Sequence, residues 1–263
     1  MKIISRAQPV HQNPAAEGAK KAEGLGLVYS ETSGTPNPKT PQTQQKQYIV
    51  SPKENRLKRL RRSIVTAARL HQQSMTETKA RFKVAMLTLT YSPYEVWEPN
   101  QIAELIRHVR QYLKRRNIPS KCVWVMELTK AGVPHYHLLF WLPKGQNLPK
   151  PDKQGWWPYG HTKIEWARKA VSYIAKYASK AQSGGSFPEG ARIHGFGGLA
   201  KADRNERSWW MLPQYMRQYT PEYRDTGPSR RAKGGGWLTP FGEWIPPKFQ
   251  VISFNPLTIQ EVY

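Results

Sequence analysis

Residues 121–142, KCVWVMELTKAGVPHYHLLFWL, constrain the fold of this chain more than any other stretch. Two runs rich in Val, Trp, Leu and Phe flank a Lys-Ala-Gly break, which predicts two strands joined by a tight hairpin. A three-residue hairpin loop favours glycine at its last, left-handed position, and Gly132 meets that need if the loop is 130–132. In that register Glu127 lies opposite His135.

The two faces of this hairpin differ in chemistry, because side chains alternate along a strand and opposed residues share a face. One face carries Glu127, His135 and His137, while the other is apolar throughout: Trp124, Met126, Leu128, Tyr136, Leu138 and Phe140. Two imidazoles and a carboxylate form a three-ligand site for a divalent metal with open positions left. The competing interpretation is that an isolated His-x-His is coincidental; the carboxylate in register favours metal, because it is costly to hold unpaired on an apolar hairpin.

The composition favours a nucleic-acid partner. The chain has 263 residues, enough for one sizeable domain with extensions or two small ones, and a net charge of +23 from 41 Lys plus Arg against 18 Asp plus Glu. So basic a chain implies a polyanion, and nucleic acid is the first candidate. Ten Trp, thirteen Tyr and seven Phe suit base stacking, although we expect most of them in the core.

The sequence also limits where the protein acts. No apolar run approaches the roughly 20 residues that span a bilayer, and the first residues contain no apolar stretch typical of a secretory signal. The single cysteine, Cys122, rules out an internal disulfide framework and suits a reducing cytoplasm. We therefore expect a cytoplasmic protein without a membrane partner.

The N-terminal part divides in two. Residues 1–52 are rich in Pro, Gln, Lys, Gly and Thr without periodicity, which predicts a disordered tail. Residues 53–80 have leucines and other apolar residues at helical spacing between basic ones, which predicts a basic amphipathic helix. Its Arg59, Arg61 and Arg62 either face phosphate or form a solvated charged face, and the sequence leaves both open.

Three further elements surround the hairpin: a strand at 82–91, a helix at about 99–116, and a short strand in GHTKIEWA, 160–167. His161, near the start of the last strand, is interpreted as an ordinary strand-end histidine, with contact to DNA or metal as the alternative.

A second unusual pattern lies in residues 165–180, EWARKAVSYIAKYASK, which predict a helix. Small and apolar residues occupy one face, and Tyr173, Lys176, Tyr177 and Lys180 fall on the other at spacings i, i+3, i+4 and i+7. By itself this pattern fits packed tyrosine rings and solvated lysines. Beside a metal-binding hairpin it indicates two hydroxyl nucleophiles with cations at hand.

The C-terminal part, 183–263, carries no chemistry that the sequence identifies. A Gly-rich connection comes first, residues 207–219 have helical character despite Pro213, and residues 236–254 predict a hairpin turning at Phe241-Gly242. No Gly-rich loop ends in Lys-Ser or Lys-Thr, so we expect no ATP-driven helicase module.

Three segments in order, MLTLTY (86–91), PHYHLLF (134–140) and YIAKY (173–177), resemble the HUH endonucleases. The likeness is to the rolling-circle replication initiators of filamentous phages, small isometric phages and plasmids, and it covers about residues 82–182. It implies an α+β fold with a central antiparallel sheet and helices packed on one face, related to the RNA-recognition fold. We accordingly expect a nuclease domain at 81–182, and at 183–263 a small C-terminal α/β extension, for which recognition of the origin duplex is one hypothesis.

The resemblance also implies roles for single residues. His135, His137 and Glu127 would bind Mg²⁺ or Mn²⁺, and Tyr173 and Tyr177 would be the nucleophiles, with Lys176 between them as a further catalytic residue. DNA contacts would come from Thr88 and Thr90 of the first segment, Lys180, and the helix arginines Arg59, Arg61 and Arg62.

The implied function is initiation of rolling-circle DNA replication in a bacterial host cell. The protein would nick one strand of single-stranded or supercoiled origin DNA, form a 5′-phosphotyrosyl intermediate, leave a 3′ hydroxyl primer and later rejoin the strand. A host helicase and polymerase would be its partners. The alternatives are an HUH transposase or mobilisation relaxase, and a non-catalytic nucleic-acid-binding protein; which tyrosine attacks first stays open.

Overall fold

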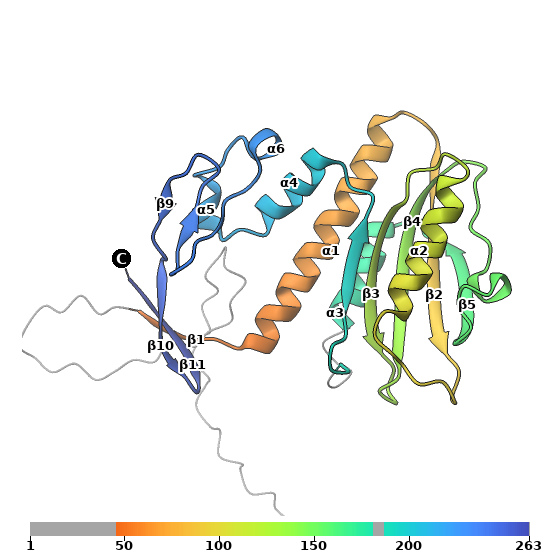
Figure 1. The fold of residues 1–263 in the computed structure, drawn as a ribbon, viewed down its shortest axis with the longest axis horizontal. Coiled ribbons are helices and arrows are strands. Elements are labelled where there is room, and N and C mark those ends of the chain that lie inside the picture. Colours follow the sequence, from red (N-terminus) through yellow and green to blue (C-terminus); the bar gives the residue numbers. More distant parts are fainter. Residues whose placement is uncertain (1–45, 181–186, 263) are drawn as a thin grey trace, which may run out of the picture.

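A five-stranded antiparallel sheet forms the centre of the protein. The structure is a computed structural model and describes residues 46–180 and 187–262, so the predicted tail at 1–45 lies outside the described residues (Figure 1). The strand order is β5-β2-β4-β3-β6. The strands are β2 (Phe82–Tyr91), β3 (Lys121–Leu128), β4 (Pro134–Pro143), β5 (Gly160–Trp166) and β6 (His194–Gly197). The predicted α+β class with a central antiparallel sheet is confirmed.

The predicted hairpin register is confirmed. Strands β3 and β4 pair with Glu127 opposite His135, and the backbone N–H of Thr129 donates to the carbonyl of Val133 at 2.9 Å. Gly132 closes the turn at φ +78°, the left-handed conformation that the loop requires and that glycine adopts without strain.

Helices cover both faces of the sheet, and not one face as the sequence predicted. Helix α2 (Gln101–Lys114) covers the Tyr136 face, where Trp97 Nε1, just before the helix, donates to Tyr136 Oη at 2.8 Å. Helices α1 (Pro52–Glu77) and α3 (Ala170–Lys180) cover the histidine face, where Trp141 Nε1 donates to Gln72 of α1 at 3.0 Å (Figure 1). Both faces need cover because apolar side chains fill the middle of each: Val123, Val125 and Leu139 on the histidine face are all fully buried.

The helices follow the expected positions with one shifted boundary. Helix α1 begins after Ser51, whose hydroxyl accepts the backbone N–H of Glu54 at 3.3 Å, and α2 lies within the predicted range. The helix predicted from residue 165 begins only at Ala170. Its first residues belong to β5 instead, because Glu165 and Trp166 pair with β2.

The C-terminal part adds short elements and two small sheets. After the 3₁₀ turn η1 (Pro151–Gln154) and the central sheet come the helices α4 (Lys201–Trp210), α5 (Gln214–Arg217) and α6 (Tyr223–Thr226). The helix predicted at 207–219 is interrupted between α4 and α5, where Pro213 lacks a backbone N–H. One small sheet contains β7 (Arg230–Arg231), β8 (Trp237–Leu238) and β9 (Trp244–Ile245).

The predicted hairpin at Phe241-Gly242 forms between β8 and β9, but it does not extend to residue 254. Strand β10 (Phe249–Phe254) pairs instead with β11 (Leu257–Glu261), which also pairs with β1 (Gln47–Ile49). Strand β1 lies within the predicted disordered tail, so that prediction is wrong for these residues. They are ordered because β11 offers them an open edge.

Candidate active site

The polar residues of the first two segments meet on the histidine face of the sheet. In the β2–β4 register Thr88 lies opposite His137 and Thr90 opposite His135, and in the β3–β4 register Glu127 lies opposite His135. Three adjacent strands therefore bring these five side chains to one face, as the alternation in the sequence predicted for the histidines and the glutamate.

Each histidine in this group has polar neighbours. His137 is 6% exposed, and its Nε2 lies 3.1 Å from Glu127 Oε2 while its Nδ1 lies 3.4 Å from Thr88 Oγ1. His135 Nε2 lies 3.4 Å from Thr90 Oγ1, and the two imidazole rings stack with centroids 5.0 Å apart. The carboxylate thus fixes the orientation of His137, and the threonines flank both rings.

These residues fit a divalent cation in donor type and backbone position. Among the described residues, however, no three His, Cys, Asp or Glu side chains converge closely enough to hold a metal ion. Glu127 is directed to His137, whereas His135 is directed to Thr90, so a change of rotamer at one of them would be needed to bring all three together. Burial lowers the pKa of His135, which favours the neutral imidazole that can bind a metal.

The two tyrosines of α3 lie against this group. The ring of Tyr177 stacks on the ring of His137, with centroids 3.5 Å apart and an interplanar angle of 26°. Tyr173, one helical turn earlier, has its hydroxyl oxygen 2.9 Å from that of Tyr177. Both side chains are half-buried. Phenol groups from a helix and imidazoles from a β-hairpin, far apart in the sequence, therefore form one cluster.

The phenol of Tyr177 is held in its neutral form. Burial is the largest cause that raises its pKa, and the hydrogen bond and charge of Tyr173 and the carboxylates of Glu127 and Glu165 act in the same direction. A nucleophilic Tyr177 would thus need a nearby cation or base to remove its proton.

Strand β5 contributes residues that sequence reasoning missed. Lys163 lies opposite Thr88 in the β2–β5 register, and its Nζ forms an ion pair with Glu165 Oε1 at 2.8 Å. The charge of Tyr173 is among the causes that raise the pKa of Lys163, after the contacts with Glu165, which places this lysine beside the tyrosines. The alternation of His161, Lys163 and Glu165 could have indicated a polar face, but not which strand lies next to it.

The remaining predicted residues are less closely tied to this cluster. Lys176 is exposed on α3, one residue before Tyr177. Lys180 is the last residue of α3, and its side chain lies outside the described part of the structure. His161 is exposed and lies opposite Thr90, at the border of the cluster.

Residues 84–182 match a family of replication-associated proteins described by the designation ORF2. The match includes β2 to β5, α2 and α3, and thus every residue of the cluster. It supports a replication-associated protein of the initiator type, with DNA as its partner. No curated protein and no solved structure matches the chain. Every helix in the described ranges is too short or too polar to cross a lipid bilayer.

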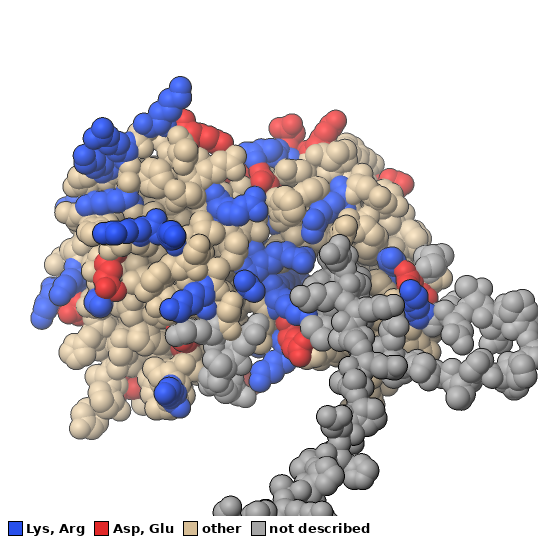
Figure 2. Space-filling view, turned by 180° about the vertical axis from the view of Figure 1, so that it is seen from behind, with Lys and Arg blue, Asp and Glu red and all other residues tan. Residues whose placement is uncertain are grey.

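The predicted DNA-contacting arginines of α1 lie elsewhere. Arg59 and Arg62 line a cavity between α1 and the C-terminal part, and Arg61 is exposed outside that cavity's lining. Figure 2 shows one face of the molecule on which Lys and Arg side chains gather toward the middle, while Asp and Glu are scattered. The basic charge is therefore not limited to the tyrosine–histidine cluster.

Proposed function

We propose that this protein initiates rolling-circle DNA replication by nicking one strand with a tyrosine nucleophile. The observation that carries the proposal is the stacking of Tyr177 on His137, with the Tyr173 hydroxyl 2.9 Å from that of Tyr177. The family match and the resemblance of the three ordered segments to HUH initiators support the same function.

The reaction conserves a phosphodiester bond. A tyrosine oxygen attacks the phosphorus in line and loses its proton, the bond from phosphorus to the 3′ oxygen breaks, and that oxygen takes up a proton to become the 3′ hydroxyl primer. The product is a 5′-phosphotyrosine, which retains the bond for later rejoining by the reverse step. Two phenols on one helical face allow one tyrosine to nick and the other to cleave after a round of synthesis.

The chain's own residues would position the reactants. Glu127 would fix the ring of His137, and His135, His137 and Glu127 would hold Mg²⁺ or Mn²⁺, which when bound polarises the phosphate and neutralises developing charge. Lys176 and Lys163 would place ammonium groups near the phosphate, and loss of one such electrostatic contact costs about 10²–10³ in rate. Thr88 and Thr90 would contact the strand beside the histidines.

A covalent-adduct assay tests the proposal. A library of single-stranded oligonucleotides labelled at the 3′ end is incubated with the protein and Mn²⁺, and labelled protein is resolved on a denaturing gel. We expect an adduct with the natural chain and none with Tyr173→Phe/Tyr177→Phe. Tyr112→Phe, whose hydroxyl donates to Asn147 on the surface at 3.3 Å, is the matched control and should keep the adduct.

Mass spectrometry of the labelled peptide would then identify which tyrosine attacks first. An adduct that persists in the double variant would refute the assignment of the nucleophiles. Salt-sensitive DNA binding without any adduct, unaffected by chelator, would favour a non-catalytic binding protein instead.

A further inference from the structure

A second basic site lies between α1 and the C-terminal part, apart from the tyrosine–histidine cluster. A cavity of about 770 Å³ is lined by residues of α1, the α4–α5 segment and the small β7–β8 sheet, and it adjoins a smaller cavity of about 340 Å³ beside β6. The two share Arg56, His194 and Arg207, so we treat them as one basic cleft.

Every charged side chain among the described residues that line the basic cleft is cationic: Arg56, Lys58, Arg59, Arg62, Arg192, Arg207 and Arg231. The like charges act on one another. Burial, with Arg59 second, lowers the pKa of Arg207 to about 10. Burial, followed by four of these arginines, lowers the pKa of His194 to about 4. So many cations at one place are costly to hold without an anion.

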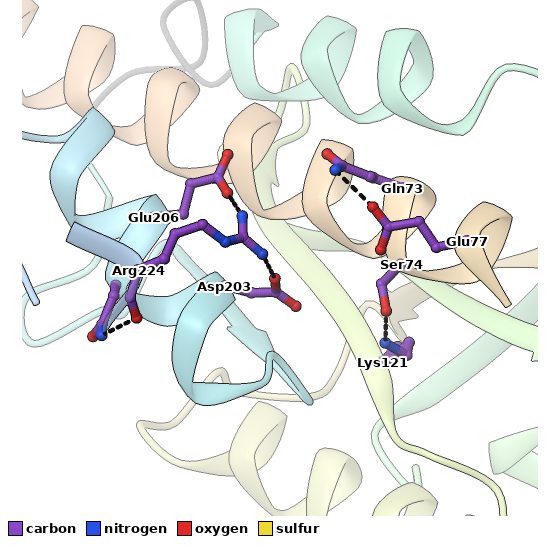
Figure 3. A network of polar contacts seen from close by, with 8 residues as sticks. Gln73, Ser74, Glu77, Lys121, Asp203, Glu206 and Arg224 are labelled. Atoms are coloured by element: carbon purple, nitrogen blue, oxygen red, sulfur yellow. Dashed lines mark hydrogen bonds and ion pairs between the residues drawn. The ribbon is translucent and has the colours of Figure 1, made fainter. Parts of the chain in front are cut away.

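The acidic residues of α4 do not relieve this charge. Asp203 and Glu206 both bind the guanidinium of Arg224 from α6, as Figure 3 shows, with the Asp203 contact at 3.3 Å. Arg207, one residue after Glu206, donates to Ser63 of α1 and lies over the ring of Phe196 at 3.9 Å. Its buried Nε has no hydrogen-bond partner among the described residues. Arg207 is therefore held in the cleft with donor capacity to spare.

We propose that the basic cleft binds the sugar–phosphate backbone of single-stranded DNA. A cavity of this volume has the size of a small-ligand site and is too narrow for a duplex, whereas a few nucleotides of one strand fit. Trp237 adds an aromatic surface to the wall, and single-strand sites combine cationic grooves with such surfaces. This proposal rests on the DNA partner of the proposed function.

The cleft is placed to hold the strand that reaches the tyrosines. His194 lies opposite Val125, and Val125 lies opposite His137, so the cleft begins in the same cross-strand row as the cluster, two strands away. Strands in a sheet are about 4.8 Å apart, which puts the two backbones about 10 Å apart. A single strand bound at the tyrosines can thus extend into the cleft.

Paired arginine variants test the proposal in the full chain. Arg56→Gln/Arg59→Gln/Arg231→Gln removes three exposed cations of the cleft, and Arg107→Gln/Arg115→Gln/Arg116→Gln removes three exposed cations of α2 and its C-terminal end. Both are made with Tyr173→Phe/Tyr177→Phe, so that binding is measured without cleavage. Fluorescence anisotropy with a labelled single-stranded oligonucleotide is recorded over a range of salt concentrations.

We expect the cleft variant to bind at least about tenfold more weakly, and its slope of log affinity against log salt to fall by about 2, since each single-strand phosphate contact contributes about 0.7. The α2 variant should change affinity about twofold or less. Equal weakening in the two variants overturns the proposal. If the cleft triple variant fails to fold, Arg231→Gln alone carries the test, with a slope change of about 0.7.

Competitors distinguish the source of the anion. A free deoxynucleoside monophosphate that displaces the oligonucleotide at equal phosphate concentration, or polyglutamate that does so at equal charge, overturns the assignment to a DNA strand. A failure of the proposed function would look different, because it removes the covalent adduct from the natural chain and leaves the difference between the two arginine variants intact.

Discussion

His71 makes the stability of this protein depend on pH. Its side chain on α1 is fully buried, with its ring centroid 5.1 Å from that of Trp141. Burial, followed by the charge of Lys121, lowers its pKa from 6.5 to about 4. Between these two pH values the unfolded chain binds a proton at this histidine that the folded protein does not. The free energy of unfolding therefore falls as pH falls from about 6.5 to about 4.

The size of this loss follows from the two pKa values. Linkage gives about 2 kcal/mol at pH 5 and about 3 kcal/mol at pH 4 relative to pH 7. The variant His71→Leu removes the titrating group, so its free energy of unfolding should decline less by those amounts. His161→Leu, at an exposed position on β5, is the matched control and should follow the natural protein.

Urea unfolding followed by tryptophan fluorescence at several pH values measures the effect. The comparison is between the slopes of stability against pH, because the variants can differ in stability at pH 7 for other reasons. Parallel curves for the natural protein and His71→Leu from pH 7 to pH 4.5 would refute the reasoning, since they would mean that the buried ring does not resist protonation.

Other parts of the structure lead to three further predictions. If Glu127 and the two histidines bind Mn²⁺, a concentration of about one hundred times the dissociation constant should raise the free energy of unfolding by about 2.7 kcal/mol; Glu127→Gln should remove most of this gain, and an equal gain in the variant would contradict the ligand assignment. Gly198→Ala should destabilise the protein by at least about 1–3 kcal/mol in urea unfolding, because Gly198 has φ +77° and an added Cβ would collide with the carbonyl of Ser120; Gly145→Ala, also at positive φ but with open space around it, should cost less. Arg224→Met should leave the nearly buried carboxylates of Asp203 and Glu206 unpaired and cost about 1–3 kcal/mol, with faster proteolysis at α6 as the local readout; unchanged cleavage there would show that the ion pairs do not hold α6 on α4.

The placement of Glu127 beside His135 could be predicted from the sequence because its causes are local. Alternation sets which residues share a face, and a glycine in the left-handed conformation fixes the loop length and hence the register. The spacing of Tyr173 and Tyr177 on one helical face follows in the same way from the helical period. These features depend on residues within about one hairpin or two helical turns of each other.

Which elements lie together was decided only by the tertiary structure. The sequence does not say that β5 pairs with β2, which brings Lys163 and Glu165 to the tyrosines, or that a helix also covers the face opposite the histidines. It also predicted a helix start at residue 165, where pairing with β2 competes and extends the strand to Trp166. Such choices depend on apolar surface buried between segments far apart in the chain, which no local pattern contains.

The same distinction separates the two candidate sites. The tyrosine–histidine cluster is assembled from segments whose chemistry is visible in the sequence, and folding only has to stack α3 on the hairpin. The basic cleft has no sequence pattern of its own, since its cations come from α1, β6, α4 and β7 and each segment by itself fits a solvated charged surface. Only packing of the C-terminal part against α1 brings these like charges close enough together to require an anion.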